Sequence, residues 1–479
     1  MLRAIRFASR YDYSFEDDLI VAASSPMIRK ALVEKISRER ILVELDSMLA
    51  GSRCRPPAAL WSIFALDLFD TVFNPTHGDD IAIEPDWTVY SSLVVCVINA
   101  LIRMVYFDDI NIINKEFMTF QTVSSSFSPF SPSDMTAADV ITAKKVETVF
   151  QKKGLESPQI VEIPSNILYS HLSSLVISNM SCPREEQDAI YEDLMMTHRL
   201  VYLAASVSGL RGIKCREVSV KDQQHKSTEG NDKTEGKKKQ NHQQASREAK
   251  TILLSTHTLR QLKLDTKSTK AIETILTGAN FVRDFVKRNG NALIINDYKL
   301  ERCGEDVEGV ALNVDDAKMR EELGMFVREM KQVWKCAVIY ACAVDIIDAF
   351  DRSLFKSFAS QALDPPKVKI LPANLTSENC SSVNRIEDSE QLEIIMSMDL
   401  IMKYVMVSRL VYIYKLEEAW TIRPLFDSKS IGSELGIKQG PQIGVVIEEA
   451  VRWQLRNPQG NGQELMKFLK DEGGNIDDT

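Results

Sequence analysis

The fold of this chain is decided by two stretches near its N-terminus, Met-Leu-Arg-Ala-Ile-Arg-Phe-Ala-Ser-Arg at residues 1–10 and Ile-Ser-Arg-Glu-Arg at residues 36–40. In the first, alanines favour a helix and arginines recur three and four positions apart, so they share one helical face. In the second, Ser37 has the chemistry of a helix cap, and Glu39 falls in the first turn, where a carboxylate complements the helix dipole. The two stretches predict short helices, the first with Arg3, Arg6 and Arg10 on one side.

The rest of the chain also has helical periodicity, and strict alternation of apolar and polar residues is scarce. We therefore predict an all-α fold. The 479 residues divide by composition into parts of different character. These parts are a helical N-terminal segment at 1–51, a helical body at 55–360, a loop at 361–389 and a helical C-terminal segment at 390–479.

Four local expectations follow from the pattern within these parts. Residues 87–105 and 269–288 have apolar residues at helical spacing, and Asn289-Gly290 has the composition of a helix stop. Residues 321–349 repeat apolar side chains at three and four positions and predict one long helix. Pro365, Pro366 and Pro372 mark the loop at 361–389.

Residues 216–250 differ in composition from everything around them. They contain nine Lys or Arg, six Asp or Glu, five Gln and no aromatic residue. Such a segment buries too little apolar surface to offset its ordering entropy, so we expect a disordered insert. A solvated loop is the simpler interpretation. A basic arm that contacts RNA phosphates, or a nuclear import signal at Lys237–Lys239, are the alternatives.

Composition limits the classes of function. The net charge of −9 argues against a generally basic nucleic-acid coat, although a local basic face is compatible with it. Eight cysteines include no Cys-x-x-Cys pair, and six histidines are dispersed, so no zinc site is indicated. Reduced, buried thiols predict an intracellular, cytoplasmic protein, with a mitochondrial or nuclear location left open.

No membrane span is expected, because the apolar stretches at 93–102 and 336–344 are too short. The arginines and serines of residues 1–14 also have the composition of a mitochondrial presequence. Acidic residues at 12, 16, 17 and 18 disrupt that pattern and favour a structural helix.

A second informative stretch lies near the C-terminus and reads Lys-Gln-Gly-Pro-Gln-Ile-Gly at residues 438–444. Gly440-Pro441 has the pattern of a helix start, with proline at the first helical position. The unpaired amides of a helix N-terminus can bind a phosphate oxygen, and Lys438 would add positive charge. The alternative is an ordinary helix corner in which Gly440 and Gly444 serve packing only.

Both ends of the chain resemble class II CCA-adding tRNA nucleotidyltransferases in their eukaryotic form. Residues 1–10 and 36–40 are similar to the helical neck of that family. Residues 424–444, followed by Trp453-Gln-Leu455, are similar to its tail, with Ser428 at a position where the family prefers glycine. The resemblance implies a curved array of helices arranged as neck, body and tail, and tRNA as the partner.

The resemblance also implies roles for particular residues. In the family, Arg3 and Arg6 would lie beside the nucleotide pocket. The neck motif would comprise Ser37, Arg38, Glu39, Arg40 and Glu44. The tRNA backbone would be contacted by Lys438, Gly440, Pro441 and Gly444.

The family's chemistry is two-metal phosphoryl transfer, with Mg²⁺ and CTP or ATP held by an Asp-x-Asp pair in a head domain. Met1 follows the point at which that head would end, so we expect the head to be absent. The chain contains no Asp-x-Asp pair, and Asp67/Asp70 and Asp345/Asp348 have helical spacing that suggests surface carboxylates. We therefore expect no catalytic residue, metal or cofactor in this chain, and no activity without a separate catalytic head.

Two function classes remain. The first is the tRNA-binding part of an enzyme of tRNA 3′-end CCA addition. The second is a helical RNA-binding or protein-binding module without catalysis. A helical scaffold unrelated to RNA is a third, less favoured, interpretation.

Overall fold

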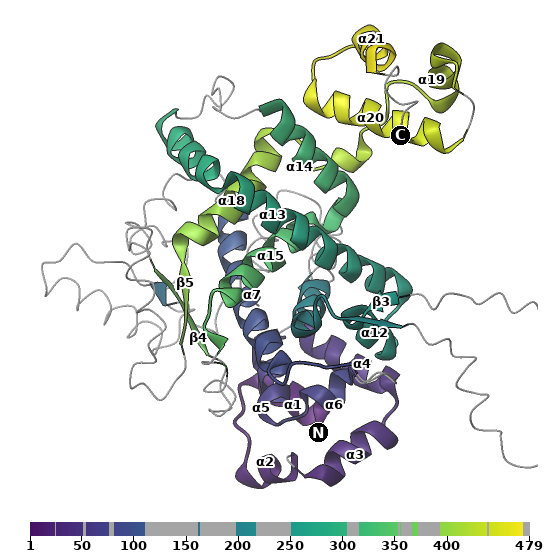
Figure 1. Ribbon diagram of the computed structural model, residues 1–479. Coiled ribbons are helices and arrows are strands. Elements are labelled where there is room, and N and C mark those ends of the chain that lie inside the picture. The colour runs from purple at the N-terminus through teal and green to yellow at the C-terminus, as the bar shows by residue number, and fades with distance from the viewer. Residues whose placement is uncertain are drawn as a thin grey trace, which may run out of the picture. The chain divides into compact units, whose positions relative to one another are not determined.

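The structure is a computed structural model, and it is mostly helical (Figure 1), which confirms the all-α prediction. Within the described residues the strands are short and form one three-stranded and one two-stranded sheet. The residues that the structure describes are 1–23, 25–50, 54–75, 81–110, 161–162, 198–216, 251–303, 316–352, 355, 366–371, 393–437 and 440–472.

The described chain forms two compact units, each assembled from three stretches. The first comprises Met1–Cys96, His198–Glu273 and Arg352–Pro365. Its helices and strands are α1 (Leu2–Tyr11), α2 (Asp17–Ala23), α3 (Pro26–Glu34), α4 (Arg38–Leu49), α5 (Pro56–Ala65), α6 (Phe69–Phe73), the start of α7 (Trp87–Ile110), η1 (Ser208–Leu210), β2 (Lys214–Arg216), β3 (Thr251–Leu253), α12 (Leu254–Gln261) and the start of α13 (Thr266–Cys303).

The core of the first unit is built from large apolar side chains. Helix α1 packs on α4 and α5 and buries Leu2 and Ile5 between them. The largest fully buried side chains of this unit are Trp61, Tyr202, Phe69, Phe73 and Phe355. The N-terminal helix is thus an integral part of the fold, as the structural interpretation of residues 1–14 requires.

The second unit comprises Val97–Thr197, Thr274–Asp351 and Pro366–Thr479. It contains the remaining parts of α7 and α13. Its other elements are β1 (Val161–Glu162), α14 (Asp316–Met330), η3 (Lys331–Val333), α15 (Trp334–Asp348), β4 (Lys367–Leu371), β5 (Glu393–Ser397), α18 (Met398–Ile413), η5 (Ala419–Thr421), α19 (Ser428–Leu435), α20 (Pro441–Arg456) and α21 (Gly462–Glu472).

The expected end of a helix at Asn289-Gly290 is wrong, because α13 continues to Cys303. Asn289 donates its side-chain amide to the carbonyl oxygen of Phe285 at 3.0 Å, one turn back in the same helix. A Cβ at Gly290 would lie 3.7 Å from the side chain of Lys403, which is an ordinary van der Waals distance. Tertiary context therefore outweighs the cost of about 1 kcal/mol that glycine carries in a helix.

The single helix expected at 321–349 is also wrong. It is divided into α14, η3 and α15, and Lys331 at the break has a φ of 53°. The apolar periodicity continues through the break, and nothing in the sequence marks this position.

The loop expected at 361–389 contains a strand. Strand β4 pairs in parallel with β5, from Lys367 opposite Glu393 to Leu371 opposite Ser397, and β1 pairs with β4 in antiparallel orientation. Ile394 and Met396 of β5 are fully buried. Strand β4 reads Lys-Val-Lys-Ile-Leu, a short alternation, but Pro366 and Pro372 on either side of it favour a loop.

Most of the insert predicted at 216–250 lies outside the described residues. Its flanks are described, and they pair with each other: Arg216 of β2 is the register partner of Thr251 of β3. The chain therefore leaves and re-enters the described part of the first unit at the same point.

Five cysteines are described with their side chains, and all five are buried thiols, as predicted: Cys54, Cys96, Cys215, Cys336 and Cys342. Burial raises the pKa of the Cys54 and Cys96 thiols to about 12. Among the described residues, no helix is long and apolar enough to cross a membrane.

Candidate nucleic-acid interface

Helices α1 and α4 are joined by ion pairs between the arginines of the first stretch and Glu44. Arg6 Nη1 lies 3.2 Å from Glu44 Oε2, and Arg3 Nε lies 3.7 Å from Glu44 Oε1. The two arginines differ in exposure, since the side chain of Arg6 is 16% exposed and that of Arg3 is 72% exposed. Arg6 is therefore fixed in the helix interface, whereas Arg3 reaches solvent.

The predicted cap of α4 is confirmed. The side chain of Ser37 accepts a hydrogen bond from the backbone N–H of Arg40 at 3.4 Å. Glu39 lies in the first turn, and hydrogen bonds from its own backbone amide and from the Ser37 side chain hold its pKa below the usual value. Ser37 and Glu39 thus stabilise the start of α4.

Arg38 has a role that the sequence did not reveal. Its guanidinium donates to the carbonyl oxygens of Thr71 at 3.3 Å and Val72 at 2.9 Å, in the last turn of α6. A cation at a helix C-terminus satisfies free carbonyls and complements the dipole. Burial lowers the pKa of Arg38. Arg40, its neighbour in the motif, is exposed.

Another ion pair, between Arg199 and Asp46, joins two distant stretches of the first unit. Arg199 is buried, and its guanidinium donates to both carboxylate oxygens of Asp46 in α4, at 2.6 and 3.0 Å. It also donates to the hydroxyl of Ser268. This bidentate pair joins residues 153 positions apart in the chain, so no local signal could have found it.

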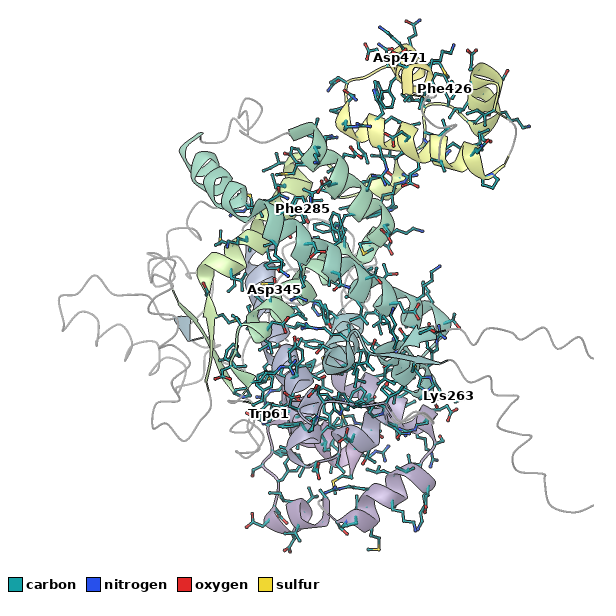
Figure 2. The ribbon with its side chains drawn as sticks, viewed as in Figure 1. Trp61, Lys263, Phe285, Asp345, Phe426 and Asp471 are labelled. Atoms are coloured by element: carbon teal, nitrogen blue, oxygen red, sulfur yellow. The ribbon has the colours of Figure 1, made fainter. Side chains whose placement is uncertain are left out.

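The C-terminal helices form a group with its own apolar core (Figure 2, around Phe426). The side chain of Asp427 accepts from the backbone N–H of Ser430 and caps α19, and Gly436 ends that helix with a φ of 71°. The buried residues of this core are Ile431, Ile443, Val446, Ala450, Trp453, Leu465 and Leu469.

The start of α20 matches the prediction from Gly440-Pro441. Gly440 is the residue before the helix, and Pro441 is at its first position. Both residues and Gly444 are exposed. A Cβ at Gly444 would meet no atom within 4 Å, so packing does not require this glycine. Lys438 lies outside the described residues.

Helix α20 is attached to α14 by a carboxylate held between two arginines. Glu321 Oε1 lies 3.2 Å from Arg452 Nη1, and Glu321 Oε2 lies 3.2 Å from Arg456 Nε. The backbone of Gly324 in α14 also packs closely against Leu455 in α20, because a Cβ at Gly324 would lie only 2.6 Å from the Leu455 side chain. The exposed start of α20 is therefore carried on a firmly anchored helix.

The expectation of surface carboxylates is wrong for Asp345, whose side chain is only 14% exposed, whereas Asp70 is exposed. Asp70 accepts from the indole N–H of Trp87 at 2.8 Å, and partial desolvation raises its pKa. Asp345 accepts hydrogen bonds from Arg283 and from the hydroxyl of Tyr404.

The Asp345 cluster is a structural network rather than an acid–base pair. Arg283 also donates to Asp348 at 2.7 Å, so one guanidinium bonds both carboxylates of the Asp-x-x-Asp pattern. Burial and the neighbouring Asp345 raise the pKa of the Tyr404 hydroxyl. Among the described residues, no group of three or more His, Cys, Asp or Glu side chains could hold a metal ion.

Comparison with curated proteins identifies relatives over short segments. A tRNA nucleotidyltransferase of Schizosaccharomyces pombe is 39% identical over 74 residues, which is 15% of this chain and 14% of the relative. Part of this chain is similar to CCA-adding tRNA nucleotidyltransferases. The mitochondrial CCA tRNA nucleotidyltransferase of Saccharomyces cerevisiae is 40% identical over 55 residues, 12% of this chain and 10% of the relative.

A bacterial relative has the same kind of short match. The CCA-adding enzyme of Lactococcus lactis is 46% identical over 55 residues, 12% of this chain and 13% of the relative. The matched segment therefore spans about one-tenth to one-seventh of each of these relatives. No protein-family profile matches the chain, and no solved structure matches it.

Proposed function

We propose that this chain is the tRNA-binding portion of an enzyme of tRNA 3′-end CCA addition. The local similarity to CCA-adding tRNA nucleotidyltransferases supports the class of function. The observation that carries the tRNA contact is the exposed start of α20, where Gly440, Pro441 and Gly444 are exposed and a Cβ at Gly444 would meet no atom within 4 Å. The free amides of a helix N-terminus bind phosphate oxygens, and Lys438, two residues before Gly440 in the sequence, would add a positive charge.

Nucleotide transfer by such an enzyme needs carboxylates that hold Mg²⁺ and the triphosphate of CTP or ATP. These 479 residues contain no Asp-x-Asp pair, and we assign no step of the transfer to them. The proposed partner for this step is a catalytic head domain that supplies the carboxylates. In that assembly Arg3 would pair with the phosphates of the nucleotide, since its guanidinium is exposed on α1.

The first experiment measures binding and transfer by the 479-residue chain alone. Affinity for tRNA is measured by fluorescence anisotropy at several salt concentrations, and incorporation of labelled CMP or AMP into CCA-less tRNA is measured in parallel. A catalytically dead full-length enzyme purified in the same way controls for contamination. Salt-sensitive binding without incorporation is expected. Absence of tRNA binding, or incorporation above the control, contradicts the proposal.

The second experiment adds a head domain that contains the Asp-x-Asp pair. Incorporation is expected to return, and Arg3→Ala is expected to lower it with little change in thermal stability. Arg6→Ala is the comparison variant, because loss of this largely buried guanidinium also affects the contact with Glu44. Unchanged incorporation by the Arg3→Ala variant removes the nucleotide-pocket assignment.

A further inference from the structure

The four N-terminal helices of the first unit carry most of the exposed apolar side chains. Of the nine large apolar side chains that are exposed among the described residues, seven lie on α1 to α4 and the turn after α1: Phe7, Tyr11, Tyr13, Val21, Met27, Val33 and Val43. Exposed apolar side chains that are concentrated in one part of a chain indicate a surface that another molecule covers.

The rings of α1 and of the turn after it form a row. Phe7 is 41% exposed, Tyr11 is 45% exposed and Tyr13 is 66% exposed. The ring centroids of Phe7 and Tyr11 are 6.1 Å apart, and those of Tyr11 and Tyr13 are 5.7 Å apart. The backbone N–H groups of Asp12 and Tyr13 both donate to the carbonyl oxygen of Ala8. The helix C-cap thus holds the last ring in line with the other two.

The C-terminal end of this row is acidic. Four exposed carboxylate residues lie there: Asp12, Glu16, Asp17 and Asp18. Two arginines oppose them, since Arg55 forms an ion pair with Asp12, and Arg10 donates to the carbonyl oxygen of Ser47. Four negative and two positive groups leave a formal charge of −2. The negative end of the α1 dipole lies at the same place.

The N-terminal end of the row is basic. Arg3 and Arg6 share one carboxylate, that of Glu44, and the side chain of Arg3 remains 72% exposed. Arg40 lies one turn before Glu44 on the same stripe of α4, and it is exposed. Glu39 is the second carboxylate here, in the first turn of α4. Three arginines and two carboxylates give these five side chains a formal charge of +1.

We propose that a second copy of this chain covers the aromatic row, in a dimer whose two α1 helices pack antiparallel about a two-fold axis. With the axis between Phe7 and Tyr11, Phe7 of one copy packs on Tyr11 of the other. The basic end of each α1 then meets the acidic end of the other, and the two helix dipoles oppose each other. A two-fold interface requires a surface that is complementary to itself, and a row with opposite charges at its ends meets that requirement.

The charge pattern selects a second copy over other occupants. A polyanion would meet like charge at the acidic end, and a cationic peptide would meet it at Arg3 and Arg40. A second copy in antiparallel orientation meets opposite charge at both ends. This inference goes beyond the proposed function and does not depend on it. A head domain whose nucleotide pairs with Arg3 would compete with the second copy for that side chain.

The first test is sedimentation of the full chain at concentrations up to about 0.1 mM, where the parent is expected to form a reversible dimer. Tyr11→Ala removes a ring from both copies and is expected to weaken the dimer at least about tenfold, because aromatic side chains at the centre of an interface carry much of its binding energy. Val445→Ala, which removes a side chain of 58% exposure on α20, is the control and is expected to behave as the parent does. A monomeric parent, or a dimer that Tyr11→Ala leaves unchanged, overturns the proposal.

The second test exchanges charges between copies. Arg3→Glu places like charges at both ends of its own dimer, and the double variant Glu16→Lys/Asp17→Lys does the same with the opposite sign. Each variant alone is expected to be monomeric, with its fold checked by thermal melting. An equimolar mixture is expected to form a heterodimer, because the substituted ends attract each other and the unsubstituted ends do as well. A mixture of the two folded variants that stays monomeric overturns the proposal.

These measurements contain neither RNA nor a head domain, so their failure leaves the proposed function standing. If the parent is monomeric and Tyr11→Ala instead weakens binding of tRNA or of a head domain, the rings contact that partner and the dimer is wrong. If the parent forms the dimer but binds no tRNA, the dimer stands and the proposed function is wrong.

Discussion

The two motifs that suggest a tRNA-related function have opposite structural settings. The N-terminal motif is largely occupied by contacts within its own unit: Ser37 caps α4, Arg38 bonds the end of α6, and Arg6 pairs with Glu44. In the C-terminal motif Gly440, Pro441 and Gly444 are exposed, and a Cβ at Gly444 would meet no atom within 4 Å. Contacts within the fold therefore account for the N-terminal motif, whereas the exposed residues of the C-terminal motif have no such structural account.

The largest expected effect is a loss of folding stability at acid pH in the first unit but not in the C-terminal helices of the second. Burial lowers the pKa of His198 in the first unit to about 4, below the unfolded value of about 6.5. The unfolded state thus binds more protons between these values, and stability present above pH 6.5 is lost as the pH falls toward 4. The expected loss is about 1.4 kcal/mol per pH unit within this window.

Hydrogen exchange, corrected for the intrinsic pH dependence, measures this effect in each unit separately. Peptides from residues 198–210 are expected to lose protection on acidification, whereas peptides from α20 are expected to keep it. The sequence from 393 to 479 contains no histidine, which makes α20 the internal control. Equal loss of protection in both places contradicts the assignment to His198.

The next effect concerns neighbouring arginines of the N-terminal motif. Arg38→Ala is expected to lower the free energy of unfolding by about 1–2 kcal/mol, because two carbonyl oxygens of α6 lose a charged donor. Arg40→Ala, at an exposed position, is expected to change it by less than about 0.5 kcal/mol. Urea denaturation measures both. Equal effects of the two substitutions would show that the motif does not act through the contact with α6.

A smaller effect of opposite sign is expected at Gly444. Alanine in place of glycine inside a helix stabilises it by about 0.5–1 kcal/mol where no clash occurs, and none occurs here. Under the proposed function, the same Gly444→Ala change weakens tRNA binding because the added methyl group hinders approach of a phosphate. A higher melting temperature with unchanged tRNA affinity would remove Gly444 from the interface.

The smallest expected effect on stability is that of Lys438→Ala. Loss of one phosphate contact is expected to reduce the salt slope of tRNA binding by about one ion, equally for different tRNAs, with no change in melting temperature. Lys429→Ala, at an exposed position in α19, is the matched control. If the two variants have the same salt slope as the parent, Lys438 does not contact tRNA.

The sequence by itself determined the helical class and the positions where helices begin. Ser37 and Pro441 could be assigned because a cap depends on the chemistry of a few adjacent residues. The buried cysteines followed from composition in the same way. Each of these features depends on local chemistry or on the average polarity of the chain.

The tertiary structure alone decided where helices continue, break or give way to strands. Helix α13 continues through Asn289-Gly290, and α14 ends at Met330 despite continuous apolar periodicity. The pairing of β4 with β5 and the bonds of Arg283 to Asp345 and Asp348 join segments distant in the chain. Such long-range contacts are comparable in free energy to intrinsic helix and strand propensities. Tertiary packing decides which residues form them, and no local sequence pattern specifies that packing.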